Sequence, residues 1–152
     1  MEKNISKKKT IVICSSITFY QDVVDIKNKL QLMGFDAIMP KLARLMEKAN
    51  NYDWNFYKKS YLGKDESYGK GLAIKRHFEE IEKGDVLLVV NNKKHSIDGY
   101  IGPNVLMEMA LAFHFGKPIF VMNPIPPTSP FIEELNAMQP IVLDGDLRKI
   151  KK

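Results

Sequence analysis

The sequence has little of what marks a secreted, metal-binding or membrane-spanning protein. Its 152 residues include one cysteine, Cys14, so a disulfide framework and a cysteine metal cluster are both excluded. The three histidines, His77, His95 and His114, include no pair with metal-ligand spacing, and no metal is predicted. No apolar run approaches the roughly 18 residues that cross a bilayer, and the N-terminus lacks an apolar signal core. We therefore expect a cytoplasmic protein without membrane contact.

Glycine-rich phosphate-binding motifs are missing as well. The turn after the first predicted strand is CSSITF, which has no glycine for the dinucleotide or Walker patterns. NAD-type binding is therefore disfavoured, and no cofactor is predicted. The hydroxyl groups of Ser15, Ser16 and Thr18 could hold a sugar hydroxyl or a phosphate at the start of the next helix. Ordinary helix capping by Ser16 or Thr18 is the alternative.

Basic residues are in excess, with a net charge of +5, but the excess lies at the two ends. Residues 1–9 and 148–152 hold eight of the 23 basic side chains, and we expect a flexible basic N-terminus and a solvated basic tail there. Residues 10–147 hold 15 basic and 17 acidic side chains, a net charge of −2. Because nucleic-acid binding calls for a basic face on the domain itself, nucleic acid is disfavoured as a partner.

Apolar runs of strand length alternate with amphipathic segments of helical period between residues 10 and 147. This alternation predicts a single α/β domain with a doubly wound parallel sheet of about five strands, and ligands beyond the carboxyl ends of the strands. The run DVLLVVNN is apolar throughout, as is typical of a central strand covered on both faces. We expect strands at 10–16, 36–40, 85–92, 117–123 and 140–144, and helices at 19–35, 69–84, 103–115 and 131–138.

Residues 41–68 do not fit the alternation and are rich in aromatic side chains, which predicts a helical insertion or lid over one end of the sheet. Trp54, Tyr57 and Tyr61 recur at helical spacing. Such a stripe indicates packing or a subunit interface more often than a platform for base stacking, and both alternatives suit a lid. The aromatic residues are Tyr52, Trp54, Phe56, Tyr57, Tyr61 and Tyr68.

Glu108 is the most informative residue for function. Its segment, VLMEMALAFHF, is apolar almost all the way round, and burying a lone carboxylate costs several kcal/mol. The side chain must therefore have partners, face a cleft, or be protonated. Asn104 lies one turn earlier on the same face. A binding or catalytic role for Glu108 is favoured over a purely structural hydrogen bond.

The stretch DVLLVVNN…GYIGPNVLMEMALAFHFGKPIFVMNPIP resembles the core of nucleoside 2-deoxyribosyltransferases and 2-deoxynucleoside 5-monophosphate N-glycosidases. That family shows a strand, a variable loop and a Glu-bearing helix that ends in Gly-Lys-Pro, matched here by residues 85–92, Glu108 and residues 116–118. The opening IVICSSIT is similar to the family's first strand and Ser-Ile turn. The resemblance covers most of the chain except the aromatic insertion.

This resemblance implies a flavodoxin-like sheet, a homo-oligomer, and a nucleoside or nucleotide as the small-molecule partner. It also implies that Glu108 attacks the anomeric carbon of the sugar, so that a glycosyl-enzyme intermediate is resolved by water or by another base. Three positions depart from the family pattern. His77 replaces an Asp, Thr18 replaces the Arg of phosphate-recognising members, and Gly102 replaces an Asp or Ser.

The sequence therefore predicts N-glycosidic bond cleavage or 2-deoxyribosyl transfer with Glu108 as the nucleophile. A non-catalytic nucleotide-binding or sensing module of the same fold is the alternative, because the three departures affect residues expected around Glu108. Amide, phenol and hydroxyl groups would contact the base edge and the sugar. The predicted substrate contacts are Ser15, Ser16, Thr18, His77, Asn91, Asn92, Tyr100, Gly102 and Asn104.

Overall fold

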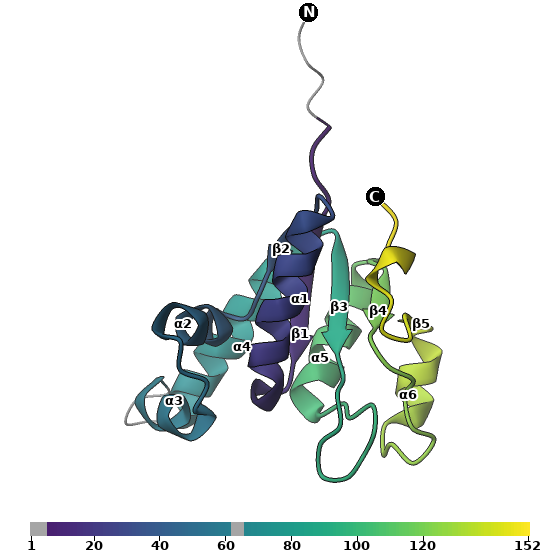
Figure 1. Ribbon diagram of the computed structural model, residues 1–152. Helices are drawn as coiled ribbons and strands as arrows, with labels where there is room; N and C mark the ends of the chain where they lie inside the picture. The colour runs from purple at the N-terminus through teal and green to yellow at the C-terminus, as the bar shows by residue number, and fades with distance from the viewer. Residues whose placement is uncertain (1–5, 62–65) are drawn as a thin grey trace, which may run out of the picture.

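The structure, a computed structural model, describes residues 6–61 and 66–152. It contains a sheet of five parallel strands in the order β2-β1-β3-β4-β5, which confirms the predicted flavodoxin-like, doubly wound α/β fold (Figure 1). The fully buried β3 lies at the centre, as its unbroken apolar run predicts. The strands are β1 (Thr10–Ser15), β2 (Asp36–Ile38), β3 (Val86–Val90), β4 (Ile119–Val121) and β5 (Ile141–Val142).

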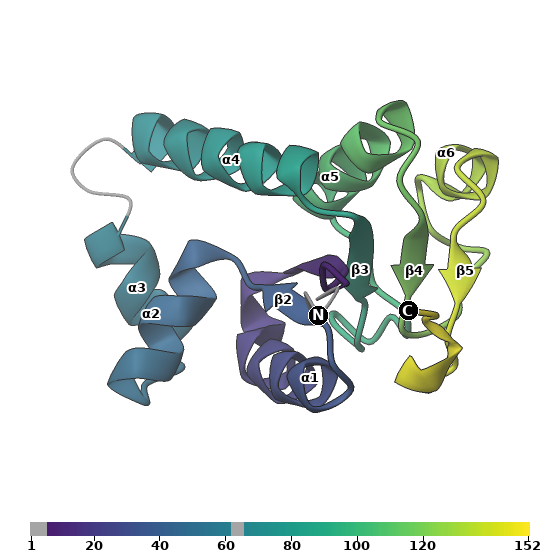
Figure 2. The same ribbon diagram turned by 90° about the horizontal axis from the view of Figure 1, so that it is seen from above.

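Helices cover both faces of the sheet (Figure 2). One face carries α1 (Tyr20–Leu32) and the short C-terminal helix η2 (Leu147–Lys149), and the other carries α4 (Glu66–Lys83), α5 (Pro103–His114) and α6 (Ile132–Ala137). The predicted insertion forms α2 (Lys41–Ala49) and α3 (Trp54–Tyr61), which lie beyond the β2 edge of the sheet. None of the helices within the described ranges combines the length and the apolar character needed to cross a membrane.

Element boundaries follow local signals in the sequence. Pro103 occupies the first turn of α5, and the helix ends before Gly116, whose φ of 66° is the left-handed conformation that glycine tolerates best. Several predicted boundaries differ from the structure by up to three residues. For example, α1 ends at Leu32 and not at residue 35, and α4 begins at Glu66 and not at residue 69. Glycines at 69 and 71 weaken helix propensity near that end, yet the helix continues through both. The side chains of Tyr61 and Tyr68 lie outside the described part of the chain.

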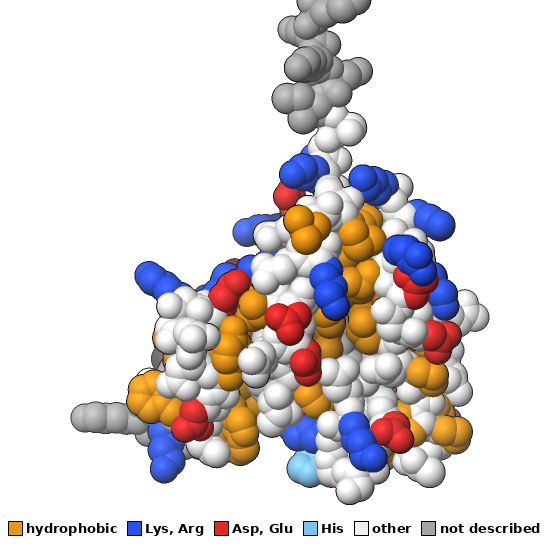
Figure 3. All heavy atoms as spheres, viewed as in Figure 1, with side chains coloured by type: hydrophobic (Ala, Val, Ile, Leu, Met, Phe, Trp, Pro, Cys, Tyr) orange, Lys and Arg blue, Asp and Glu red, His pale blue; other side chains and the backbone are white. Residues whose placement is uncertain are grey.

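The C-terminal segment packs against the core although its charged side chains are exposed. Ile150 is only 3% exposed and joins Leu147 and Leu143 in the apolar cluster between the sheet and α1. Arg148 and the lysines around it remain in solvent, as predicted for the basic residues there. Both termini leave the molecule at the same end, opposite the carboxyl ends of the strands, and Figure 3 shows Lys and Arg side chains gathered there. The charges of residues 6–9 and 148–152 are therefore remote from the strand ends where ligands bind in this fold.

Several large apolar side chains remain exposed on the outer surface of α4 and α5. Leu72, Met107, Phe113 and Phe115 are each at least 40% exposed. Such a surface is typical of association sites. The homo-oligomer implied by the resemblance stays a prediction.

Lys117, from the Gly-Lys-Pro motif, joins two elements that frame the functional site. Its Nζ donates to Ile81 O at 2.7 Å and also to the carbonyl oxygens of Glu82 and Gly84, at the C-terminal end of α4. These carbonyls lack partners inside the helix. A lysine ammonium satisfies them and also favours the negative end of the helix dipole. The motif therefore fixes the end of α4 beside the chain that leaves α5.

Replacing this ammonium should cost stability. We expect Lys117→Met to lower the free energy of unfolding by about 1–3 kcal/mol, because three helix-end carbonyls lose a charged donor. Urea denaturation measures the change. Lys83→Met is the matched control, since Lys83 is exposed at the same helix end and should give a change within about 0.5 kcal/mol. Equal effects of the two substitutions would contradict this role for Lys117.

Candidate functional site

A cavity of about 510 Å³ opens where β1 and β3 end. Its walls come from the loops after these two strands, from α4 and the first half of α5, and from the insertion helices α2 and α3. The chain leaves these two neighbouring strands toward opposite faces of the sheet. In this fold, ligands bind at such a position. Of the residues predicted to contact substrate, the cavity brings together Ser15, Ser16, His77, Tyr100, Gly102 and Asn104 with Glu108.

Glu108 lies in the wall of this cavity, with its side chain 14% exposed. The buried thiol of Cys14, on β1, lies near the carboxylate. Burial raises the pKa of Glu108, while the nearby His77 and the Cys14 thiol act to lower it. Burial also raises the pKa of the Cys14 thiol well above its usual range, and the negative charge of Glu108 raises it further. The Cys14 thiol therefore stays neutral beside the carboxylate.

His77 connects Glu108 to a second carboxylate. Its Nδ1 lies 2.9 Å from Glu80 Oε2, one turn later on α4, and its Nε2 lies 3.8 Å from Glu108 Oε1. The guanidinium of Arg44, on α2, donates to Glu80 Oε1 at 2.8 Å and to Met39 O. Burial would raise the pKa of Glu80, but the hydrogen bonds from His77 and Arg44 outweigh it and hold that pKa below its usual range. Arg44, Glu80, His77 and Glu108 therefore form a continuous chain of contacts.

This chain of contacts fixes the orientation of the His77 imidazole toward Glu108. An ionised Glu80 only accepts hydrogen bonds, so Nδ1 carries the proton of that contact and the neutral tautomer leaves Nε2 as an acceptor. Nε2 is buried and has no hydrogen-bond partner among the described residues. An acceptor facing an ionised carboxylate is unfavourable, so the pair is stabilised when a proton resides on Nε2 or on Glu108.

Tyr100 and Gly102 shape the mouth of the cavity above α5. A side chain built at Gly102 would place its Cβ 3.3 Å from the Tyr100 hydroxyl, closer than ordinary van der Waals contact. The phenol therefore occupies the space that an Asp or Ser side chain would need at this position. The Tyr100 ring also lies beneath the ammonium of Lys94, 5.4 Å from Nζ to the ring centroid.

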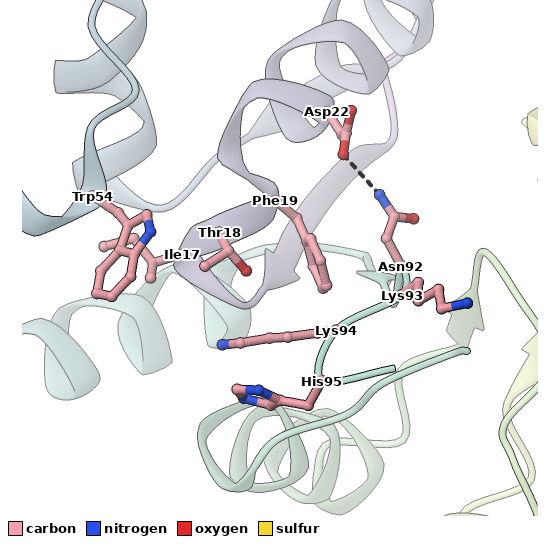
Figure 4. A pocket seen from close by; sticks show the side chains of 9 residues that line it. All are labelled: Ile17, Thr18, Phe19, Asp22, Trp54, Asn92, Lys93, Lys94 and His95. Atoms are coloured by element: carbon pink, nitrogen blue, oxygen red, sulfur yellow. Dashed lines mark hydrogen bonds between the residues drawn. The ribbon is translucent and has the colours of Figure 1, made fainter. Parts of the chain in front are cut away.

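Three of the predicted contacts do not line the Glu108 cavity. Asn91 is fully buried, and its amide bonds the backbone of Asn123 and the Gly99 carbonyl, which gives it a structural role in joining two loops. Asn92 donates to Asp22 Oδ2 at 2.8 Å, and with Thr18 it lines a neighbouring cavity of about 700 Å³ (Figure 4). Thr18 stays close to the first site, because its hydroxyl lies 3.2 Å from Ser16 Oγ.

Sequence reasoning missed several groups that the fold brings to the cavity. Glu80 follows His77 by three residues on one helix, a spacing that brings side chains together and could have identified the pair. Arg44 gave no local signal, because it approaches from the insertion. Trp54 lines both cavities and is 37% exposed, whereas Tyr57 is buried, so the aromatic stripe divides between a mouth residue and a packing residue.

The described residues include no cluster of three or more His, Cys, Asp or Glu side chains that could hold a metal ion. Comparison of the chain with protein-family models and with curated proteins gives no significant match.

The buried carboxylate should cost the fold stability at neutral pH. A carboxyl whose pKa is higher in the folded state than in the unfolded state loses its stabilising contribution as the pH rises through the folded value. We therefore expect Glu108→Gln to be more stable than the wild type at pH 7, and the difference to shrink as the pH falls toward 4. Thermal unfolding across this range measures it. A difference that grows with falling pH would show that Glu108 is held by partners that outweigh its burial.

Proposed function

We propose that the chain cleaves or transfers the N-glycosidic bond of a nucleoside or nucleotide, with Glu108 as the nucleophile. The observation that carries the proposal is a carboxylate in the wall of a cavity at the carboxyl ends of β1 and β3, coupled to an imidazole. Around it lie hydroxyl, phenol and amide groups from Ser16, Tyr100 and Asn104, which suit sugar hydroxyls and base edges. The sequence resemblance to 2-deoxyribosyltransferases assigns the same role to this glutamate.

The chemistry proceeds in two displacements at the anomeric carbon. A Glu108 oxygen forms a bond to C1′ as the C1′–N bond breaks, and the electron pair leaves with the base, which takes a proton from water. A water oxygen then attacks C1′, the bond to Glu108 breaks with its electron pair returning to the carboxylate, and the water proton passes to solvent. A second base in place of water gives transfer. Each step inverts C1′, so the product retains the starting configuration.

His77 supports this reaction as a positioning residue. The nucleophile must be ionised, and burial works against ionisation. The nearby His77 lowers the pKa of Glu108 and so offsets part of that cost, and Glu80 with Arg44 holds the ring in place. The histidine at this position, where the resemblance leads one to expect an acid, therefore favours the ionised state that nucleophilic attack requires.

A non-catalytic nucleotide-binding module is the second candidate. Burial raises the pKa of Glu108, and a protonated carboxyl is a hydrogen-bond donor and not a nucleophile. Such a group would still bind a base or sugar in the same cavity. The two functions differ in whether free base is released.

Replacing the nucleophile separates these functions. We expect Glu108→Gln to reduce release of free base from 2′-deoxynucleosides or their 5′-phosphates by roughly 10³-fold or more, with ligand affinity largely kept. Chromatography of the released base and calorimetric titration provide the two measurements. Glu133→Gln, a substitution on the far helix α6, should change neither. Tight binding by the wild type without base release would support the binding module instead.

The acid limb of the pH profile tests the coupling between His77 and Glu108. We expect kcat/KM to fall with decreasing pH through a value above the ordinary glutamic acid pKa of about 4.3, because burial raises the pKa of Glu108. His77→Gln should move this limb to higher pH, since an influence that lowers the Glu108 pKa is lost.

The control for this shift is His114→Gln, at the exposed end of α5, which should leave the limb in place. A His77 variant that lost activity equally at every pH would show that the histidine only packs against Glu108.

A further inference from the structure

The Glu108 cavity collects positive charge that a neutral deoxynucleoside does not need. Among the described residues, five cationic side chains and two carboxylates line it. Glu80 is already paired with Arg44 and Arg76 has an interaction of its own, so the four lysines and Glu108 leave a formal charge of +3 with His77 neutral. Residues 10–147 as a whole carry −2. Like charges that share a cavity repel one another, so this clustering favours an anionic ligand. The cations are Lys41, Lys58, Lys70, Arg76 and Lys94.

Lys94 is the half-buried member of this set, and it connects the two strand ends. It lies in the loop after β3, and its Nζ donates to Ser16 Oγ at 2.7 Å, directly after β1. The ion pairs found among the described residues do not include Lys94, so its charge is balanced by no described carboxylate. Figure 4 shows its side chain extended past Thr18, whereas Lys93 points the other way. An ammonium beside a hydroxyl is a donor pair suited to phosphate oxygens.

The other four cations come from three helices and are exposed at the cavity. Lys41 begins α2, Lys58 lies on α3, and Lys70 and Arg76 lie on α4. None of the three lysines takes part in an ion pair found within the described residues. The insertion therefore supplies positive charge at the mouth, in addition to the Lys94 and Ser16 pair.

The positive charge of the cavity distinguishes between ligands that carry no phosphate, one phosphate or several phosphates. A phosphate monoester carries about −1.5 to −2 at pH 7. A 5′-monophosphate therefore leaves the +3 lining with uncompensated positive charge, whereas further phosphates of a polyphosphate chain match it. A neutral nucleoside compensates none of it.

We propose that the ligand of the Glu108 cavity is a nucleoside di- or triphosphate. Its first phosphate binds Lys94 Nζ and Ser16 Oγ, and its outer phosphates bind the lysines at the mouth, Lys41, Lys58 and Lys70. This inference rests on the proposed function for the nucleoside part of the ligand. The phosphate sites rest on the charge and geometry of the cavity alone.

Binding to a protein that cannot turn over tests the proposal. Calorimetric titration of Glu108→Gln with the four common 2′-deoxynucleosides, their 5′-monophosphates and their 5′-triphosphates, in buffer with EDTA, gives an affinity series. We expect the dissociation constant to fall by roughly tenfold or more at each step for at least one base. The gain in affinity from each added phosphate should shrink as the salt concentration is raised, because the charges at the mouth are exposed.

Two further substitutions in the same background locate the phosphates. Lys94→Gln should weaken both phosphorylated ligands by roughly tenfold and leave the nucleoside unchanged. Lys41→Gln combined with Lys58→Gln should weaken the triphosphate alone. Lys93→Gln removes the same charge from the neighbouring position, where Nζ lies 3.8 Å from Asp98, and should change none of the three affinities. Thermal unfolding confirms that each variant is folded.

A triphosphate that binds no tighter than the monophosphate overturns the proposal, as does a nucleoside that binds as tightly as either. The outcome is separate from the proposed function. Base release from unphosphorylated nucleosides without any phosphate preference would leave the function standing and remove this inference. The affinity series without base release from the wild type would leave the phosphate sites and remove the catalytic role.

Discussion

The burial of the Glu108 carboxylate is the constraint on which the site depends. A lone carboxylate in an apolar helix is unfavourable, and this fold balances it with groups from three separate elements. Cys14 lies near it on β1, His77 approaches from α4, and Arg44 on α2 fixes the histidine through Glu80. Each contact requires the others to be in place, because a partner removed from such a network leaves the remaining charge uncompensated. Packing of α4 against α5 and β1 is therefore a condition for the proposed chemistry as well as for stability.

The parallel sheet explains why these groups meet. Its order places β1 beside β3, so the hydroxyl groups after β1 and the loop that bears Lys94 and Tyr100 emerge side by side. The insertion between β2 and α4 then brings Trp54 and two lysines over the same opening. The order of the strands and the position of the insertion thus bring together residues that are far apart along the chain.

The architecture could be predicted from the sequence because its signals are local. The buried run of β3, the proline and glycine at the two ends of α5, and the regular alternation each indicate an element without reference to the rest of the chain. Glu108 could be singled out for the same reason, since a charge in an apolar helix is visible in one segment. The start of α4 was misplaced because the glycines near it weaken the helical signal without ending the helix.

The companions of Glu108 were harder to predict because they depend on tertiary contacts. Arg44 reaches Glu80 across 36 positions of sequence, and no pattern announces that contact. Asn91 was expected at the ligand because it ends a central strand, yet its amide is used to join two loops. The net charge of the whole chain also did not indicate that positive charge gathers at the cavity. The lysines at the termini lie at the far end of the molecule, whereas five cations inside an almost neutral body line one cavity.

In the proposed reaction, Glu108 forms a covalent bond to the anomeric carbon of a nucleoside or nucleotide. The most direct measurement of this bond is mass spectrometry of the protein after rapid acid quenching during turnover. We expect a mass increase equal to the sugar moiety without its base, located on the peptide that contains Glu108. Free base produced at the same rate without any sugar-linked peptide, or with the sugar on another residue, would contradict it.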